Sequence, residues 1–452
     1  MRRNLISLYL ISLLFLSCSQ GGSSPYPIVV PLDFAGLIHA GSSNNLDWEY
    51  DLLNELGSSW VHRDFSWSSI QRDAEKDLSP DQWNWESFDS FVERANNEGK
   101  KILGMLLYDV EWVHVRYGND NERRIFPNEI DDFCTYARET VKRYNGKNGH
   151  GKVDVWCIWN EPNLANRFWK GTQEEFFELT KTVAHEIRVL DEDEDTKTFL
   201  IGGAFNTQVT NDWIDGIYTY GAMDEIDGIA FHPYMISAES TNNAYNNFKN
   251  NVAKYGFNNK IWINEVGYPT YSEKNSRPPG RYGTDAWEGD MPDQVTKTIA
   301  LLAASGARTL YWYHLFDGPT RNDNDSEDWF GLVWRKSDEE WIRKGGYWGY
   351  ALCANNLPGK TLNTGRFAYL DKPYQKKSLY FEGPDKSRVL IIWNESAFYS
   401  TTINMKLPGK NHNQWSTVDG SSTSIGPNVV QTLYPVRQSD SGPNLLFFTW
   451  DE

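Results

Sequence analysis

The sequence has few of the residues from which disulfide frameworks and metal centres are built. Its 452 residues include four cysteines, Cys18, Cys134, Cys157 and Cys353, which form no CxxC pair and no zinc-ligand spacing. The eight histidines contain no HExxH motif. We therefore expect no metal and no cofactor. We also expect the last three cysteines to be free buried thiols, with pairing of two of them as the alternative in an exported protein.

Positive charge is also scarce. There are 44 Lys and Arg against 61 Asp and Glu, which gives a formal net charge of −17. Because binding to a phosphate backbone needs clustered basic side chains, this balance argues against a nucleic-acid partner. Aromatic residues are abundant instead, with 20 Trp and 24 Tyr. Flat amphipathic rings suit ligands with an apolar face and polar edges, such as sugars, although a large aromatic core would account for most of them.

The apolar run at the N-terminus is too short to span a bilayer. Arg2 and Arg3 precede an apolar stretch over residues 5–16, which ends at Leu16-Ser17-Cys18 and is followed by polar, Ser- and Gly-rich sequence. This pattern resembles a bacterial lipoprotein signal. It implies removal of the signal, lipidation of Cys18, and export to the cell envelope, where the lipid is the only membrane contact. Secretion after cleavage near Ser17 is the alternative.

Short apolar runs alternate with helical patterns over most of the chain, which is typical of parallel strands joined by crossover helices. Helical periodicity is clear at 174–190, 291–305 and 340–354. Eight such units predict an α/β fold, a (β/α)8 TIM barrel. A doubly wound sheet would need a Gly-rich phosphate loop, which the sequence lacks. The eight predicted strands are Phe34–Ile38, Trp60–Phe65, Lys101–Leu107, Val153–Trp159, Thr198–Gly202, Gly228–Phe231, Lys260–Asn264 and Thr309–Tyr313.

Four segments follow from these patterns. We assign 1–17 to the signal peptide, 18–32 to a tether and lead-in strand, 33–356 to the barrel and 357–452 to a β-rich, sandwich-like accessory domain. No Ser/Gly-rich linker separates the last two, so we expect them to be docked rigidly. Strands of the accessory domain are predicted at Ser378–Phe381, Val389–Trp393, Thr401–Leu407 and Leu445–Trp450.

Two acidic residues follow predicted barrel strands. Glu161 ends the fourth strand, within Trp159-Asn160-Glu161-Pro162-Asn163, and Glu265 ends the seventh. The carboxyl ends of the strands form the rim where barrels build active sites. Two carboxylates that face one bowl are what glycoside cleavage requires. Competitors of Glu265 with poorer placement are Glu225, Asp227 and Glu239.

The sequence around Glu161, with Leu164 and Phe168-Trp169, resembles the strand-4 motif of clan A glycoside hydrolases, most closely family 39. Arg63, His232-Pro233-Tyr234 and Glu265 occupy the order that this resemblance expects along the barrel. It implies a retaining hydrolase that cleaves β-glycosidic bonds of a polysaccharide, or of its oligosaccharides, by double displacement. The carboxyl groups of the two glutamates should then lie about 5–5.5 Å apart.

The same resemblance implies a role for each residue near the two carboxylates. Glu161 would be the general acid/base, with a raised pKa at rest, and Glu265 the ionised nucleophile. Asn160 would hydrogen-bond the sugar 2-hydroxyl. Arg63 would favour the charged form of Glu265, unless it simply pairs with Asp64.

Five further residues complete the predicted carbohydrate site. His232 and Tyr234 would orient Glu265 and line the subsite of the cleaved sugar, unless His232 only ends its strand in a turn. Trp312 is a candidate stacking floor, with core packing as the alternative. His39 and Trp169 either reach the substrate or pack within rim loops.

A different class of function remains open from the sequence. A cell-surface glycan-binding lipoprotein with a silent barrel would bind sugars without releasing reducing ends, and retention of both Glu161 and Glu265 argues against it. A uronate substrate such as iduronate would need basic residues in the bowl, where the sequence offers few.

Overall fold

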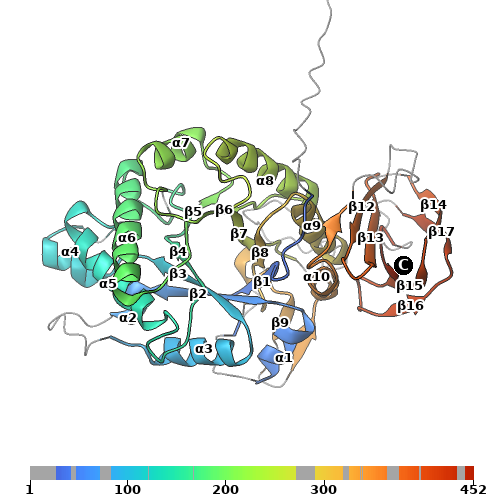
Figure 1. Cartoon of the computed structure of the whole chain (residues 1–452), viewed down its shortest axis with the longest axis horizontal. Helices are drawn as coiled ribbons and strands as arrows, with labels where there is room; N and C mark the ends of the chain where they lie inside the picture. Colours follow the sequence, from blue (N-terminus) through green and yellow to red (C-terminus); the bar gives the residue numbers. More distant parts are fainter. Residues whose placement is uncertain are drawn as a thin grey trace, which may run out of the picture.

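Eight parallel strands close into a barrel in chain order, with β1 hydrogen-bonded to β8 as well as to β2 (Figure 1). This confirms the predicted TIM barrel. The computed structural model describes residues 27–41, 47–71, 83–120, 122–165, 167–270, 291–318, 325–335, 337, 340–363, 376–396, 399–434 and 443–452. The barrel strands are β1 (Ala35–Ile38), β2 (Trp60–Ser66), β3 (Lys101–Leu107), β4 (Val155–Ile158), β5 (Leu200–Asn206), β6 (Gly228–His232), β7 (Ile261–Val266) and β8 (Thr309–Trp312).

Helices surround the barrel, and their apolar faces pack on the outer face of the strands (Figure 1). The longest, α6, begins with a capping box in which Thr172 and Glu175 bond each other's backbone N–H, at 3.2 and 2.7 Å. The described helices are α1 (Asp47–Glu55), α2 (Trp67–Ile70), α3 (Glu86–Asn97), α4 (Glu111–Tyr117), α5 (Ile130–Arg143), α6 (Gln173–Glu194), α7 (Asn211–Thr219), α8 (Ala238–Ala253), α9 (Met291–Ala304) and α10 (Gly345–Asn356), with 3-10 turns at Pro127–Glu129 and Ser326–Trp329.

Large aromatic rings fill the interior of the barrel at its amino end. Trp60, Trp262 and Tyr311 meet there, with ring centroids 5.6 to 6.0 Å apart. Gly36 faces this cluster, and a Cβ at its position would lie 2.7 Å from the ring of Tyr311. Because rings close this end, the space for a ligand lies at the carboxyl ends of the strands.

The C-terminal part forms two antiparallel sheets, which confirms the predicted β-rich accessory domain. A core that includes Leu390, Ile403 and Phe448 lies between the sheets, as in a sandwich. The larger sheet has the order β11-β12-β13-β18-β15-β16, and the smaller one pairs β14 with β17. Their bounds are β11 (Thr361–Leu362), β12 (Lys376–Glu382), β13 (Ser387–Asn394), β14 (Thr401–Lys406), β15 (Lys410–Trp415), β16 (Ser422–Ser424), β17 (Asn428–Leu433) and β18 (Leu445–Asp451).

The accessory domain packs beside α9 and α10 (Figure 1). The barrel-facing side of its larger sheet, including Phe381, Ile391 and Phe447, belongs to the same buried core as the barrel helices. Within this contact the buried Lys297 on α9 donates to Asn444 Oδ1 at 3.1 Å. A shared apolar core supports the predicted rigid docking.

Several boundaries differ from those predicted. β5 continues to Asn206 instead of ending at Gly202, and the helix predicted over 340–354 begins only at Gly345. It does so because β10 (Trp341–Arg343) first pairs with β9 (Val333–Arg335). Strands β15 to β17 were missed because polar residues dominate them.

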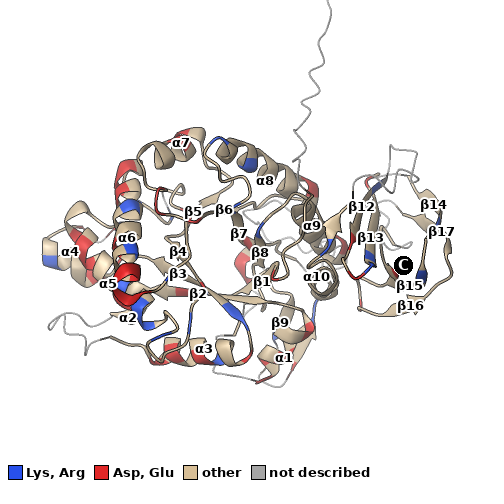
Figure 2. Ribbon diagram, viewed as in Figure 1, with Lys and Arg blue, Asp and Glu red and all other residues tan. Residues whose placement is uncertain are grey.

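The N-terminal signal, the cysteines and the surface charge are three further features about which the sequence makes predictions. The predicted signal and Cys18 lie outside the described residues. No helix in the described part is long and apolar enough to cross a membrane. Cys134, Cys157 and Cys353 are free and buried, as predicted. In the view of Figure 2, Lys and Arg are scattered singly among Asp and Glu on the outer helices.

Candidate active site

A cavity of ≈ 180 Å³ opens at the carboxyl ends of the barrel strands. The side chains that line it come from the ends of several strands and from the loops that follow them. They are His39, His62, Asp64, Tyr108, Asn160, Glu161, Arg167, Phe168, Tyr234, Glu265, Tyr313, Glu327 and Phe330.

The two glutamates predicted from the sequence meet in this cavity. Glu161 follows β4, Glu265 lies near the end of β7, and one carboxylate oxygen of each lies within 4.8 Å of the other. Such closeness matches the short carboxyl separation of retaining glycosidases, about 5–5.5 Å, and not the 6.5–9.5 Å or so of inverting ones.

Three neighbouring side chains hold the carboxylates in place. Asn206 Nδ2 donates to Glu161 Oε1 at 3.0 Å, and the hydroxyl of Tyr234 donates to Glu265 Oε1 at 2.8 Å. The imidazole of His232 lies between the glutamates, with Nδ1 at 3.0 Å from Glu161 and 3.7 Å from Glu265. Hydrogen bonds to fixed donors preorganise both groups.

The same contacts set the protonation of the pair. Burial raises the pKa of Glu265 to about 7, with the charge of Glu161 adding to the effect. Burial also acts to raise the pKa of Glu161, but the hydrogen bonds from His232 and Asn206 outweigh it and hold the pKa below its ordinary value. Burial lowers the pKa of His232, yet the charges of both glutamates more than reverse this. In the resting site the pKa shifts are therefore the reverse of those predicted. Glu265 has the raised pKa and Glu161 the lowered one, whereas the predicted roles need a protonated Glu161 and an ionised Glu265.

The backbone around the cavity is strained. His39, Tyr108, Trp159, Glu161 and Ala204 have positive φ values of 50°, 67°, 66°, 42° and 42°. Residues with a Cβ rarely adopt this region, and each such residue costs of order 1–3 kcal/mol. All five lie at or near the carboxyl ends of β1, β3, β4 and β5. Strain concentrated at one rim is typical of a functional site, where it aims side chains that regular strands would turn away.

The prediction for Arg63 is wrong. Side chains alternate along β2, so that His62 and Asp64 line the cavity while Arg63 points to the outer face. Its guanidinium lies 4.7 Å from the ring centroid of Phe88 and donates to the carbonyl oxygen of Ser87 at 3.1 Å. Arg63 therefore packs on α3 and makes no contact with Glu265.

Two aromatic residues predicted at the site lie away from the cavity: Trp312, the candidate stacking floor, and Trp169, for which the alternative of loop packing holds. Trp312 is fully buried between the barrel and its helices, against Tyr268, because alternation along β8 points Tyr311 and Tyr313 inward instead. Trp169 is fully buried against Trp159, at a centroid distance of 5.1 Å, and its Nε1 donates to a loop carbonyl. Neither ring reaches the cavity.

The other predicted residues lie at the site. His39, Asn160 and Tyr234 line the cavity. His232 is completely buried, so it contacts the carboxylates without forming part of the cavity surface. The alternation of β2 could have revealed His62 and Asp64, and a longer β5 would have revealed Asn206. Arg167 and Glu327, which form an ion pair at 3.6 Å, carry no local signal in the sequence.

A TIM barrel with two adjacent carboxylates at its rim defines the architecture of retaining clan A glycosidases. The sequence profile of glycosyl hydrolases family 39 matches residues 125–266, which contain both Glu161 and Glu265. This match confirms the predicted resemblance to family 39. A β-xylosidase from Caldicellulosiruptor saccharolyticus is 47% identical over 57 residues. These residues are 12% of this chain and 11% of that enzyme, so the chain matches only a small part of its curated relative.

Solved structures share the whole architecture at low identity. A family 39 glycoside hydrolase from Bacteroides cellulosilyticus WH2 superposes with a TM-score of 0.70 at 18% identity, over 93% of this chain and 81% of that one. A family 39 β-xylosidase from Caulobacter crescentus has a TM-score of 0.61 at 12% identity, over 94% and 97% of the two chains. These similarities establish the fold, barrel and accessory domain together.

Proposed function

We propose that the chain is a retaining β-glycoside hydrolase in which Glu265 attacks the anomeric carbon and Glu161 serves first as acid and then as base. The observation that carries this proposal is the distance of under 4.8 Å between their carboxylate oxygens, inside one cavity. At this spacing direct attack gives a covalent glycosyl-enzyme, and water then displaces it with help from Glu161.

Substrate binding is needed to bring the proton to the correct carboxyl group. In the resting site Glu265 has the higher pKa, raised by burial, while the hydrogen bonds of His232 and Asn206 favour the ionised form of Glu161. A glycosidic oxygen beside Glu161 is only an acceptor, so it favours the protonated acid there. A sugar hydroxyl that donates to Glu265 favours its ionised form. A bound glycoside thus shifts the shared proton to Glu161.

The lining of the cavity favours a neutral sugar. Four carboxyl groups line it, from Asp64, Glu161, Glu265 and Glu327. Arg167 is the one lysine or arginine among the described lining residues, and it already pairs with Glu327 at 3.6 Å. A uronate would meet repulsion without a compensating cation. The rings of Tyr108, Phe168, Tyr313 and Phe330 offer apolar contact to a pyranose, so we infer a neutral β-linked polysaccharide or its oligosaccharides as substrate.

A pair of variants tests the two roles. With aryl β-glycosides as substrates, Glu265→Ala should lower kcat by at least about 10⁴-fold whatever the leaving group. Glu161→Ala should spare substrates with a good leaving group, such as dinitrophenol, at the glycosylation step, and lose about 10²–10⁴-fold on poor ones. Glu225→Ala, which removes a partly exposed carboxylate outside the cavity, is the matched control and should keep full activity.

Two outcomes would contradict the proposal. Equal loss in both glutamate variants, independent of the leaving group, would overturn the assigned roles. Sugar binding by the unmodified protein without release of reducing ends would favour the glycan-binding alternative.

We also propose that the chain is exported and anchored through a lipid on Cys18. The support is the signal-like sequence over residues 1–18. Labelled palmitate fed to an expressing bacterium should be incorporated by the native sequence and not by Cys18→Ser, and the variant should move to the soluble fraction. Equal labelling of both would rule out this anchor.

A further inference from the structure

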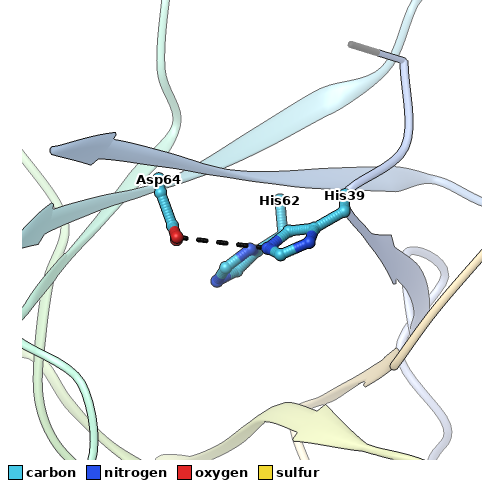
Figure 3. A group of neighbouring side chains, drawn as sticks. All are labelled: His39, His62 and Asp64. Carbon is cyan, nitrogen blue, oxygen red and sulfur yellow. Dashed lines mark ion pairs between the residues drawn. The ribbon is translucent and has the colours of Figure 1, made fainter. Parts of the chain in front are cut away.

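A second group of titratable side chains lies in the same cavity, on the side formed by β1 and β2 (Figure 3). His39 follows β1 directly, and His62 and Asp64 lie two residues apart on β2, so they share a face of that strand. One nitrogen of each imidazole and one oxygen of Asp64 lie within 4.8 Å of one another. His39 Nε2 lies 4.0 Å from Asp64 Oδ2. We call these three residues the histidine cluster.

The histidine cluster contains one buried polar atom whose bonding need is not met. His62 is 4% exposed, and its buried Nδ1 has no hydrogen-bond partner in the described structure. The carboxylate of Asp64, 41% exposed, faces the cavity, where its nearest charged partner is His39 at 4.0 Å, and the neighbouring Arg63 points to the other face of the strand, toward Ser87. A buried polar group left without a partner costs about 1–3 kcal/mol, and more if it is charged. Such groups call for a ligand.

The donor set indicates the kind of ligand. Two imidazole nitrogens and one carboxylate oxygen suit first-row divalent cations such as Zn²⁺, whereas Ca²⁺ and Mg²⁺ prefer oxygen alone. Ligand atoms at about 2.0–2.1 Å from a tetrahedral zinc lie roughly 3.3 Å apart. The 4.0 Å between His39 and Asp64 therefore needs to shorten by less than 1 Å, and the other ligand distances, which are within 4.8 Å, by at most about 1.5 Å. The His39 side chain, 48% exposed, has the freedom to make this movement.

We propose that His39, His62 and Asp64 form a binding site for one divalent transition-metal cation, Zn²⁺ or a close relative, in the wall of the sugar cavity. Three protein ligands leave a position open for water or a sugar hydroxyl. The site goes beyond the proposed hydrolysis and does not depend on it.

The second group of similar composition, Glu161, His232 and Glu265, does not suit a metal as well. His232 Nδ1 already lies 3.0 Å from Glu161, which also accepts from Asn206, and Glu265 accepts from Tyr234 at 2.8 Å. A cation there would have to displace hydrogen bonds that are already formed. The histidine cluster has no such bonds to lose.

Calorimetric titration of chelator-treated protein with Zn²⁺ alone, at pH 7.5, tests the site. We expect one equivalent to bind, and Co²⁺ to give a visible absorption band with the same stoichiometry. His39→Ala and Asp64→Asn should each weaken binding at least about tenfold, since even loss of a residue behind a metal ligand has that effect. His39→Ala alters a half-exposed side chain and Asp64→Asn is isosteric, so both should fold, and thermal midpoints check this.

Two further variants locate the metal. His185→Ala removes an exposed imidazole on α6 that lies 3.3 Å from Glu225, and it should bind Zn²⁺ as the native protein does. Glu161→Gln should also bind it fully, because that residue belongs to the other group. Absence of binding to the native protein would overturn the proposal. So would unchanged affinity in His39→Ala and Asp64→Asn, or loss of binding in Glu161→Gln. None of these outcomes bears on the role of Glu265 in hydrolysis.

Discussion

Two groups of acidic and histidine side chains face one cavity, and they differ in how far the protein satisfies them. Glu161, His232 and Glu265, which we call the carboxylate cluster, are bonded to one another and to Asn206 and Tyr234. The histidine cluster has a single ion pair, at 4.0 Å. Each cluster keeps one buried imidazole nitrogen without a partner in the described structure, His62 Nδ1 in one and His232 Nε2 in the other. The first arrangement fixes geometry before the substrate arrives, and the second leaves bonding capacity for a ligand.

The contrast follows from where each group lies along its strand. Glu161 and Asn206 sit beyond positive-φ positions at the ends of β4 and β5, where the backbone turns both side chains toward His232 on β6. His62 and Asp64 lie within the regular part of β2 and project straight into the cavity. The first set meets partners on other strands, whereas the second meets mainly His39. Four variants test this difference, from the largest expected effect to the smallest.

Removal of His232 should break the carboxylate cluster most severely. His232→Ala takes away a hydrogen bond to Glu161 and a positive charge beside Glu265, so the pKa of both carboxyl groups should rise. We expect kcat/KM to fall on the order of 10²–10³-fold, because the buried Glu161 and the partly buried Glu265 both lose their compensating charge. The acid limb of the pH profile should move to higher pH. An acid limb at the same pH as in the native protein would show that His232 does not control the pKa values of Glu161 and Glu265.

Tyr234→Phe tests one bond of the same cluster. It deletes the 2.8 Å hydrogen bond to Glu265, which lowers the pKa of that carboxyl group. Loss of a bond to a charged group should cost about 10- to 100-fold in kcat and shift the acid limb upward. Tyr220→Phe removes a hydrogen bond of the same length to Glu178 on the exterior, and its kinetics should be unchanged. Equal effects of the two variants would count against the assignment.

His114 provides a third arrangement, outside the cavity, in which both ring nitrogens have partners. Burial lowers the pKa of His114, but hydrogen bonds to Asp109 and Glu129, at 3.2 and 2.8 Å, outweigh it and raise the pKa to about 9. Protonated His114 therefore stabilises the folded state. This contribution to the free energy of unfolding is complete below pH 6.5, the pKa of histidine in the unfolded chain, and is lost as the pH rises through 9. His114→Gln should lower the free energy of unfolding by about 1–2 kcal/mol at pH 6 and far less at pH 10. Denaturant titrations at both pH values measure this, and a pH-independent loss would refute the charge argument.

The smallest expected effect comes from Glu265, whose ionisation in the carboxylate cluster destabilises the folded state. The pKa of Glu265 is raised from 4.5 to about 7, chiefly by burial, so the folded state binds more protons than the unfolded state between these values. Stability therefore falls as pH rises through this window. Glu265→Gln should raise the thermal midpoint at pH 8 by about 2–4 °C and leave it unchanged at pH 4. Glu225→Gln, at a partly exposed position outside the cavity, is the control and should leave the thermal midpoint unchanged. A lower midpoint for Glu265→Gln than for the native protein at pH 8 would contradict the view that ionised Glu265 destabilises the fold.

Local patterns in the sequence were sufficient for the barrel and its two glutamates. Each strand is a short apolar run between helical stretches, and Glu161 and Glu265 follow two of these runs directly. The accessory sandwich was recognised from its apolar strands. Its polar members β15, β16 and β17 were not, because they lack an apolar run, and two of them pair with strands that are not their neighbours in the sequence, β15 with β18 and β17 with β14.

The remaining site residues depend on the direction in which each strand faces. A displacement of one residue along β2 separates Arg63, which packs on α3, from His62 and Asp64, which line the cavity. The same displacement on β8 separates Trp312 from Tyr313. In β5 the register shifts between Gly202 and Phe205, and this irregularity brings Asn206 to Glu161. Which side chains of a strand point into the barrel depends on how all eight strands pair when the barrel closes. The sequence of a single strand does not determine it.

The anomeric configuration of the first sugar released tests the central claim most directly. Proton NMR of an aryl β-glycoside undergoing hydrolysis, recorded before mutarotation, distinguishes the two possible products. Attack by Glu265 on the sugar, at the separation of under 4.8 Å from Glu161, predicts that the β-anomer appears first and the α-anomer only later. Initial release of the α-anomer would mean that water attacks directly, and the double-displacement account would be wrong.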